Sequence, residues 1–218
     1  YWPEMQSGEI AIYKHLFTLA QKKGVRLVFA STLPGADGFV LQTKIINEHI
    51  IPGGFTKGLK YGENWVQLGW LPGWETSLRA LVTDIHKVAP TDQFGTPIDQ
   101  IPMMKNIRSV KDIDLLGYGA GFVDEYARQW TGHGKPVIVN LLSATVAMAK
   151  PWFEKGLVKA YLNGMRGDAE YEILSGFRGG SLAAMDAQSF GHLFAILILA
   201  IPNVLYLARR RAEGQSKS

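Results

Sequence analysis

The hydrophobic and polar positions of residues 1–176 change period repeatedly along the chain. Short apolar runs, which are typical of buried strands, are followed by segments with apolar residues three and four positions apart, which are typical of helices covering a sheet. The predicted strands are residues 25–30, 64–69, 112–118, 135–142 and 157–162, and the predicted helices are 10–22, 39–50, 74–88, 122–130, 145–154 and 166–174.

This alternation of strands and helices predicts the fold class. We expect an α/β domain in which five mostly parallel strands form one sheet with helices on both faces, in a flavodoxin-like or half-Rossmann layout. The first helix illustrates the pattern, because Ile10, Tyr13 and Phe17 fall on one side of it. Gly24 follows that helix and favours its end.

The C-terminal part has a different pattern. Residues 190–208 contain no Asp, Glu, Lys or Arg, and about 20 apolar residues are enough to cross a bilayer as a helix. A buried core helix is the alternative, but Arg209, Arg210 and Arg211 follow the run directly. We therefore expect an extramembrane domain over residues 1–176, a linker over 177–189, a transmembrane helix over 190–208 and a basic tail over 209–218.

The three arginines also predict which way the helix runs. Cytoplasmic flanks of membrane helices are enriched in Lys and Arg, so the tail is expected in the cytoplasm and the domain on the other side. That topology needs an upstream signal peptide or a second membrane helix, and the opposite topology stays open. Two polar residues inside the run, His192 and Asn203, are candidates for contact with a partner helix. For His192, reaching the headgroups is the simpler explanation.

Composition and charge exclude several classes of protein. The 218 residues include no cysteine, which rules out a disulfide scaffold, a Cys-ligated zinc module and a thiol enzyme. The net charge is +4, and residues 1–181 hold 19 basic against 17 acidic residues. This near balance, without a basic stripe, does not favour nucleic-acid binding.

Ligands of open α/β sheets bind beyond the carboxyl ends of the strands, and this rule selects the candidate binding residues. They are Ser31, Thr32, Asp37, Gly119, Gly121, Ser143 and Arg166. The glycines could expose backbone amides to an anion at a helix start. The spacing is not that of a dinucleotide-binding loop, however, and close packing of strand and helix explains the same glycines.

The sequence does not favour catalysis. Neither a nucleophile elbow nor a diagnostic carboxylate pair is present, and no two histidines have metal-ligand spacing. Most histidines are expected at the surface or at helix ends. No metal or cofactor is predicted.

An apolar loop and a tryptophan cluster are the remaining unusual features. The loop, residues 89–111, carries Phe94, Met103 and Met104 and is too apolar to be disordered. We expect it to pack on its own domain or, as the second interpretation, on a partner. Trp70 and Trp74 bracket a predicted turn and admit the same two interpretations, since tryptophan and methionine are enriched in interfaces.

Four stretches carry a resemblance to a known family. They are residues 61–69 (YGENWVQLG), 90–104 (PTDQFGTPIDQIPMM), 166–172 (RGDAEYE) and 185–189 (MDAQS). Together they resemble an uncharacterised family of bacterial membrane-anchored proteins, over most of residues 24–208. The resemblance implies an architecture, a bacterial inner membrane and an upstream membrane helix, and it implies no catalytic residue.

These observations lead to one main functional hypothesis and two alternatives. The main one is a non-catalytic accessory or scaffolding subunit of a larger respiratory, photosynthetic or transport-related membrane complex, with other membrane-protein subunits and the lipid bilayer as its partners. The first alternative is a receptor for a small molecule or anion at the strand ends. The second is a membrane-bound hydrolase.

Overall fold

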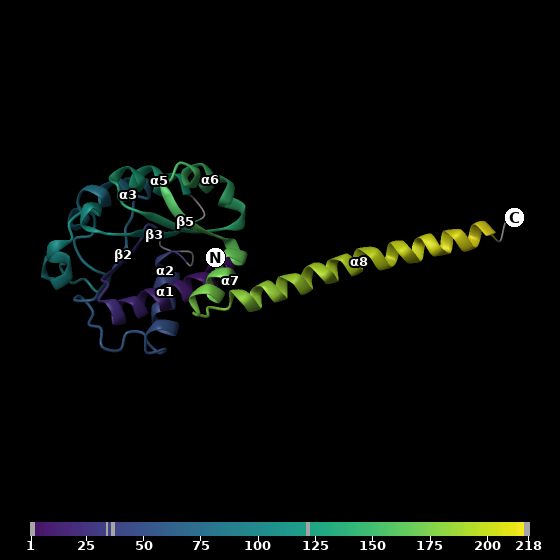
Figure 1. The fold of residues 1–218 in the computed structure, drawn as a ribbon, viewed down its shortest axis with the longest axis horizontal. Coiled ribbons are helices and arrows are strands. Elements are labelled where there is room, and N and C mark those ends of the chain that lie inside the picture. The colour runs from purple at the N-terminus through teal and green to yellow at the C-terminus, as the bar shows by residue number, and fades with distance from the viewer. Residues whose placement is uncertain (1–2, 34, 36–37, 121–122, 216–218) are drawn as a thin grey trace. The chain divides into compact units, whose positions relative to one another are not determined.

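The computed structural model of the chain describes residues 3–33, 35, 38–120 and 123–215 (Figure 1). The chain divides into two compact units, Tyr1–Ser181 and Leu182–Ser218. The strands are β1 (Leu27–Ser31), β2 (Trp65–Trp70), β3 (Leu116–Ala120), β4 (Val137–Leu141) and β5 (Val158–Asn163). The α-helices are α1 (Pro3–Lys23), α2 (Phe39–Ile45), α3 (Glu75–Thr83), α4 (Ile85–Val88), α5 (Val123–Trp130), α6 (Val146–Glu154), α7 (Gly164–Ser175) and α8 (Ser181–Gln215).

The expected α/β class and the parallel pairing are confirmed, but the single five-stranded sheet is wrong. β1 pairs with β2 in one parallel sheet, with Val28 opposite Val66, and β3, β4 and β5 form a second one in that order. Hydrophobic periodicity marks each strand but carries no information on whether neighbouring edges hydrogen-bond. A flavodoxin-like layout is therefore not established by the pairing.

Helices cover both faces of the strand layer. In Figure 1, α3, α5 and α6 lie on one side of the strands of the first unit, and α1 and α7 lie on the other. Helix α1 contacts both sheets, because Phe17 stacks on Phe29 of β1 while a Cβ on Gly119 of β3 would meet Glu9 and Met5. A single helix thus joins the two halves of the domain.

The boundaries of α1 follow from simple local chemistry. Pro3, which cannot donate a backbone hydrogen bond, stands at the first helical position, where no acceptor is needed. Lys22 and Lys23 lie in the last turn, where positive charge is favoured. Gly24 then adopts a φ of 68°, the left-handed conformation that commonly ends helices.

Several boundaries differ from those expected. The predicted helix 74–88 is broken at Asp84, which has extended backbone and whose side chain accepts from the N–H of Lys87 to start α4. The predicted strand 112–118 begins four residues later, because Asp112 forms a capping box with Ser109 and belongs to a 3₁₀ turn. Helix α2 continues into a π-helical turn, η1 (Ile46–Ile50).

The linker expected over residues 177–189 is shorter than predicted. Helix α8 starts at Ser181, so residues 181–189 are helical. The buried carboxylate of Glu172 provides a hydrogen-bond acceptor at this helix start, since its Oε1 accepts from the N–H groups of Gly179 (2.9 Å) and Ser181 (2.7 Å).

Considered by itself, α8 is a continuous helix of 35 residues with Pro202 inside it. The stretch Ser181–Arg210 is long and apolar enough to cross a membrane, judged by length and composition. The amide of Asn203 donates to the carbonyl of Leu199 one turn earlier (2.6 Å). This bond satisfies a polar group within the helix itself, as an apolar environment requires.

Candidate functional site

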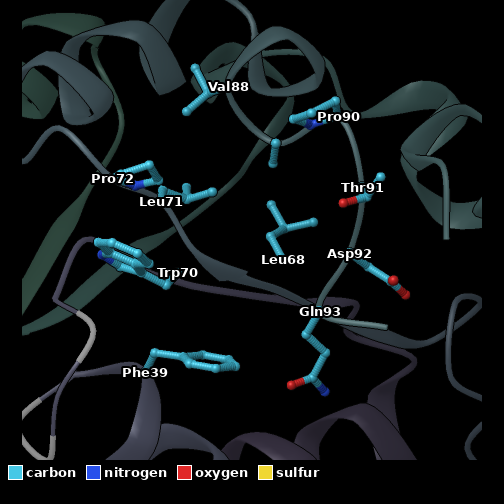
Figure 2. A pocket seen from close by; sticks show the side chains of 11 residues that line it. Phe39, Leu68, Trp70, Leu71, Pro72, Val88, Pro90, Thr91, Asp92 and Gln93 are labelled. Carbon is cyan, nitrogen blue, oxygen red and sulfur yellow. The ribbon is translucent and has the colours of Figure 1, made fainter. Parts of the chain in front are cut away.

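A hollow of about 400 Å³ lies beyond the carboxyl end of β2 (Figure 2). Ligand sites of parallel sheets are found at such strand ends. The residues around the hollow come from the end of β2, the start of α2 and the segment after α4. They are Phe39, Leu68, Trp70, Leu71, Pro72, Val88, Ala89, Pro90, Thr91, Asp92 and Gln93.

One wall of the hollow is aromatic. Trp70 is 47 % exposed, and Figure 2 shows its ring on the same side of the hollow as that of Phe39. The indole N–H donates to the carbonyl of Thr32 (3.3 Å), and the N–H of Leu71 donates to the carbonyl of Ser31 (2.7 Å). The ring is therefore held by its polar edge, and its apolar face is available for contact.

The opposite wall carries a carboxylate that is already engaged. Asp92 is buried, and its Oδ1 accepts from the N–H groups of Phe94 (2.9 Å) and Thr96 (2.8 Å), while Oδ2 accepts from the Tyr61 hydroxyl (3.0 Å). Figure 2 shows this carboxylate pointing away from the hollow and the Thr91 hydroxyl pointing toward it. This wall therefore offers the Thr91 hydroxyl to a ligand, whereas the Asp92 carboxylate stabilises the loop through its own hydrogen bonds.

The turn that follows Trp70 is strained. Trp74 has a φ of 48°, the one positive value among the non-glycine residues that the structure describes, and Gly73 beside it has a φ of 107°. The Ser77 hydroxyl donates to the carbonyl of Pro72 and fixes the turn against α3. Strained backbone of this kind tends to occur at functional sites.

A second hollow, of about 720 Å³, adjoins the first and shares Pro72 and Val88 with it. It runs along α3 and α4, and its other lining residues are Thr76, Ser77, Ala80, Thr83, Asp84 and Lys87. The two hollows meet at these shared residues and together form one surface depression.

The structure brings some of the predicted strand-end residues together. The carbonyl of Ser31 accepts from the N–H of Leu71, and the carbonyl of Thr32 accepts from the Trp70 indole. The Thr32 hydroxyl also shares a hydrogen bond with that of Tyr126 in α5 (3.0 Å). Tyr126 was not predicted from the sequence. The end of β1 is therefore tied both to the hollow and to the helix that follows β3.

Gly119 is placed beside a carboxylate, which changes its expected chemistry. A Cβ at this position would collide with Oε1 of Glu9, so the bare Cα makes room for that side chain. Burial raises the pKa of the Glu9 carboxyl from 4.5 to about 7. An acidic group over Gly119 does not favour the binding of an anion there.

The remaining predicted binding residues do not join this group. Arg166 is exposed on α7 and forms an ion pair with Glu170 one turn later (2.9 Å). Ser143 is exposed in a 3₁₀ turn that follows β4. Asp37 and Gly121 lie outside the described residues.

The loop over residues 89–111 packs on its own domain, which was the first of the two interpretations. Met103 and Met104 are 3 % and 0 % exposed and belong to the core around β2, so they do not form a partner surface. The loop is built from the 3₁₀ turns η2 (Ile98–Gln100), η3 (Pro102–Asn106) and η4 (Val110–Asp112). Phe94 is the exception, since it is 71 % exposed and contacts Tyr61 edge-on.

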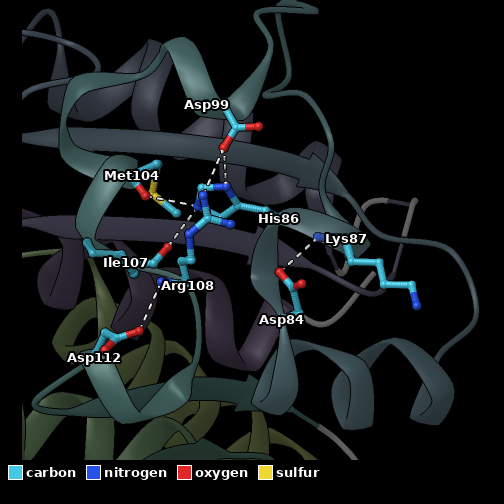
Figure 3. A network of polar contacts seen from close by, with 8 residues as sticks. All are labelled: Asp84, His86, Lys87, Asp99, Met104, Ile107, Arg108 and Asp112. Atoms are coloured by element: carbon cyan, nitrogen blue, oxygen red, sulfur yellow. Dashed lines mark hydrogen bonds and ion pairs between the residues drawn. The ribbon is translucent and has the colours of Figure 1, made fainter.

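A buried histidine holds this loop in place (Figure 3). Nδ1 of His86 pairs with Oδ1 of Asp99 (2.8 Å), and Nε2 donates to the carbonyls of Met104 (2.9 Å) and Ile107 (3.0 Å). The expectation that most histidines lie at the surface is wrong for His86, which is 8 % exposed. In the sequence, the position of His86 directly after the apolar Ile85 was the signal that it could be buried.

The polar residues of α8 remain candidates for partner contact. His192 is exposed on the isolated helix, and the Asn203 amide is engaged with Leu199. Within residues 3–33, 35, 38–120 and 123–215, no group of three or more His, Asp or Glu side chains is arranged to hold a metal ion.

Comparison of the chain with models of protein families, with curated proteins and with solved structures finds no match. The resemblance to bacterial membrane-anchored proteins therefore stays a prediction.

Proposed function

We propose that the chain is a membrane-anchored, non-catalytic accessory subunit of a larger membrane complex, and that the aromatic hollow holds an apolar segment of a neighbouring subunit. The observation that carries this proposal is the exposed face of Trp70 in a hollow whose nearest carboxylate, Asp92, is fully engaged with its own loop.

The composition of the hollow supports a protein segment as its occupant. Phe39, Trp70, Leu71 and Pro72 offer apolar contact, and tryptophan is enriched among the residues that dominate binding energy. The Thr91 hydroxyl supplies a hydrogen-bonding group at the opposite wall. The adjoining second hollow extends the depression, which suits an extended segment.

The helix α8 supports a membrane setting. Anchoring in the same bilayer raises the effective concentration of two subunits, so that a modest hollow is sufficient for stable association. Arg209 and Arg210 follow the apolar run and favour a cytoplasmic C-terminus, with the domain outside, in a bacterial inner membrane. A reporter that is active only in the cytoplasm, fused after Ser218, tests this sidedness, and an inactive reporter contradicts it.

The partner proposal is tested by site-specific crosslinking in native membranes. A photoreactive amino acid at Thr91, which points toward the hollow, is expected to link the full chain to one membrane protein. The same amino acid at Phe153, an aromatic residue of α6 that is 43 % exposed, serves as the matched control. A link formed equally from both positions would argue against a specific hollow.

A substitution completes the test. Trp70→Glu places a charge on the aromatic wall and is expected to abolish the crosslink from Thr91, whereas Phe153→Ala leaves it unchanged. Thermal unfolding of each variant checks that the domain stays folded. A crosslink that survives Trp70→Glu in a folded chain would refute the proposal.

The volume of the hollow favours a second candidate, a receptor for a small apolar molecule. About 400 Å³ lies within the range of small-molecule pockets, roughly 300–1,000 Å³. In this case small aromatic compounds, screened in the absence of membranes, raise the melting temperature of the full chain. They leave the melting temperature of the Trp70→Glu variant unchanged. A raised melting temperature, together with the absence of any protein crosslink from Thr91, would favour the small-molecule receptor over the protein partner.

We also propose that the elements follow a flavodoxin-like or half-Rossmann order, with β1 and β3 side by side although, among the described residues, the two sheets are not hydrogen-bonded to each other. Its support is the parallel pairing within each sheet and the contact of α1 with Phe29 of β1 and Gly119 of β3. An experimental structure in which β1 and β3 are not neighbours would contradict it.

A further inference from the structure

The edge strand β3 presents a bare face toward α1. Gly117 and Gly119 are both exposed, and the parallel register places Gly119 opposite Asn140 of β4. Residues paired in this way project to the same face of a sheet and are about 5 Å apart. Any group above Gly119 therefore lies beside the side chain of Asn140.

The group above Gly119 is the carboxylate of Glu9. Its Oε1 occupies the space that a Cβ of Gly119 would fill, with the methyl group of Met5 next to it. Among the described residues Glu9 has neither a hydrogen bond nor an ion pair that would compensate its charge. A half-buried carboxylate of this kind favours a positively charged or hydrogen-donating neighbour.

The buried side chain of Asn140, on the same face, lacks hydrogen-bond partners among the residues that the structure describes. Its side chain is 5 % exposed in the middle of the three-stranded sheet, and neither Oδ1 nor Nδ2 has a hydrogen-bond partner within the described part of the chain. Buried amides are almost always paired, so an unpaired one needs an explanation. A ligand that bonds both Asn140 and Glu9 provides one.

We propose that Glu9 and Asn140 bind the primary ammonium group of a small soluble molecule. An ammonium offers three N–H donors and a positive charge. The Glu9 carboxylate accepts one donor and balances the charge, and Oδ1 of Asn140 accepts a second. Divalent cations such as Ca²⁺ need six or more oxygen ligands, which two side chains do not supply. This site is separate from the aromatic hollow and does not depend on it.

The test measures thermal unfolding of the full chain in a lipid-free detergent at pH 8. Ethylammonium chloride is compared with tetramethylammonium chloride at equal ionic strength, because the second cation has the same charge but no N–H donor. Ethylammonium is expected to raise the melting temperature of the unmodified chain, and tetramethylammonium is not. Equal shifts with the two salts, or none with either, would overturn the proposal.

Variants assign the effect to the two side chains. Glu9→Gln and Asn140→Leu are each expected to raise the half-saturating concentration of ethylammonium at least about tenfold, whereas Asn140→Asp, which keeps an acceptor, retains the response. Glu48→Gln, at an exposed carboxylate of η1, is the matched control and leaves the response unchanged. An undiminished response in both Glu9→Gln and Asn140→Leu would assign binding elsewhere and refute the site.

Discussion

Replacing His86 tests whether one side chain holds the loop between α4 and β3. The variant His86→Leu keeps a side chain of similar size in the core but removes every donor of the ring. The single N–H at Nε2, which is shared between the carbonyls of Met104 and Ile107, is lost. Met104 keeps a second partner, the N–H of Ile107 at 3.1 Å, whereas no other hydrogen bond is described for the Ile107 carbonyl.

The magnitude follows from these partners. The shared hydrogen bond contributes about 1 kcal/mol, and leaving the Ile107 carbonyl unpaired adds about 1–2 kcal/mol. We therefore expect His86→Leu to lower the free energy of unfolding by about 2–3 kcal/mol. For a domain of this size that corresponds to a drop in melting temperature of about 4–12 °C.

The matched control removes the exposed partner of the same ring. Asp99 is 71 % exposed, so Asp99→Ala breaks the contact with Nδ1 but is expected to cost below about 1 kcal/mol. Denaturant unfolding of the full chain, followed by tryptophan fluorescence, measures both variants. Hydrogen exchange at residues 103–107 is expected to accelerate in His86→Leu alone. Similar losses in the two variants would show that the buried carbonyl bonds do not hold the loop.

Three further changes probe other parts of the domain. Glu9→Gln is expected to match the unmodified chain below pH 4.5 and to be more stable above pH 7, by up to about 3 kcal/mol. The reason is the raised pKa of Glu9: between pH 4.5 and 7 the carboxyl is ionised in the unfolded chain but still protonated in the fold, so the stability of the unmodified chain falls across this interval and stays low above it. Unfolding across pH 4–9 in an amine-free buffer measures this, and parallel curves would contradict it. Met104→Ala is expected to cost about 2–5 kcal/mol in denaturant unfolding, since this side chain is fully buried, and a loss below about 1 kcal/mol would argue against its core position. Glu172→Ala removes the acceptor for the N–H groups of Gly179 and Ser181 and is expected to accelerate hydrogen exchange at the start of α8. Glu170→Ala changes an exposed neighbour and is the control, which is expected to leave the exchange rate unchanged.

Local patterns were sufficient to predict most elements and the apolar helix at the C-terminus. The stripe of Ile10, Tyr13 and Phe17 correctly marks the buried face of α1, because the helical period directly reflects which side meets the core. Whether β1 and β3 hydrogen-bond depends on how the two edges approach each other. No residue of either strand encodes that approach alone, so one sheet was expected where the structure has two.

Side chains that serve the fold through a distant partner were the ones missed. His86 bonds residues 18 and 21 positions later in the chain, and such pairings become visible only when the loop is folded. Glu9 lies one residue before the helix that the apolar stripe predicts, and it was left out of every candidate site. The structure extends α1 to Pro3, which places Glu9 inside the helix and over β3.

Gly119 shows that a strand end can be located correctly from the sequence while the ligand expected there has the wrong charge. Gly119 was selected because ligands bind at strand ends and because a bare backbone can cradle an anion. In the fold, the room left by the missing Cβ is filled by the Glu9 carboxylate, and the amide of Asn140 lies unpaired on the same face. The sign of the nearest charge decides which ligand such a space accepts. A strand end that the sequence makes suitable for an anion is therefore better suited, in the folded chain, to an ammonium group.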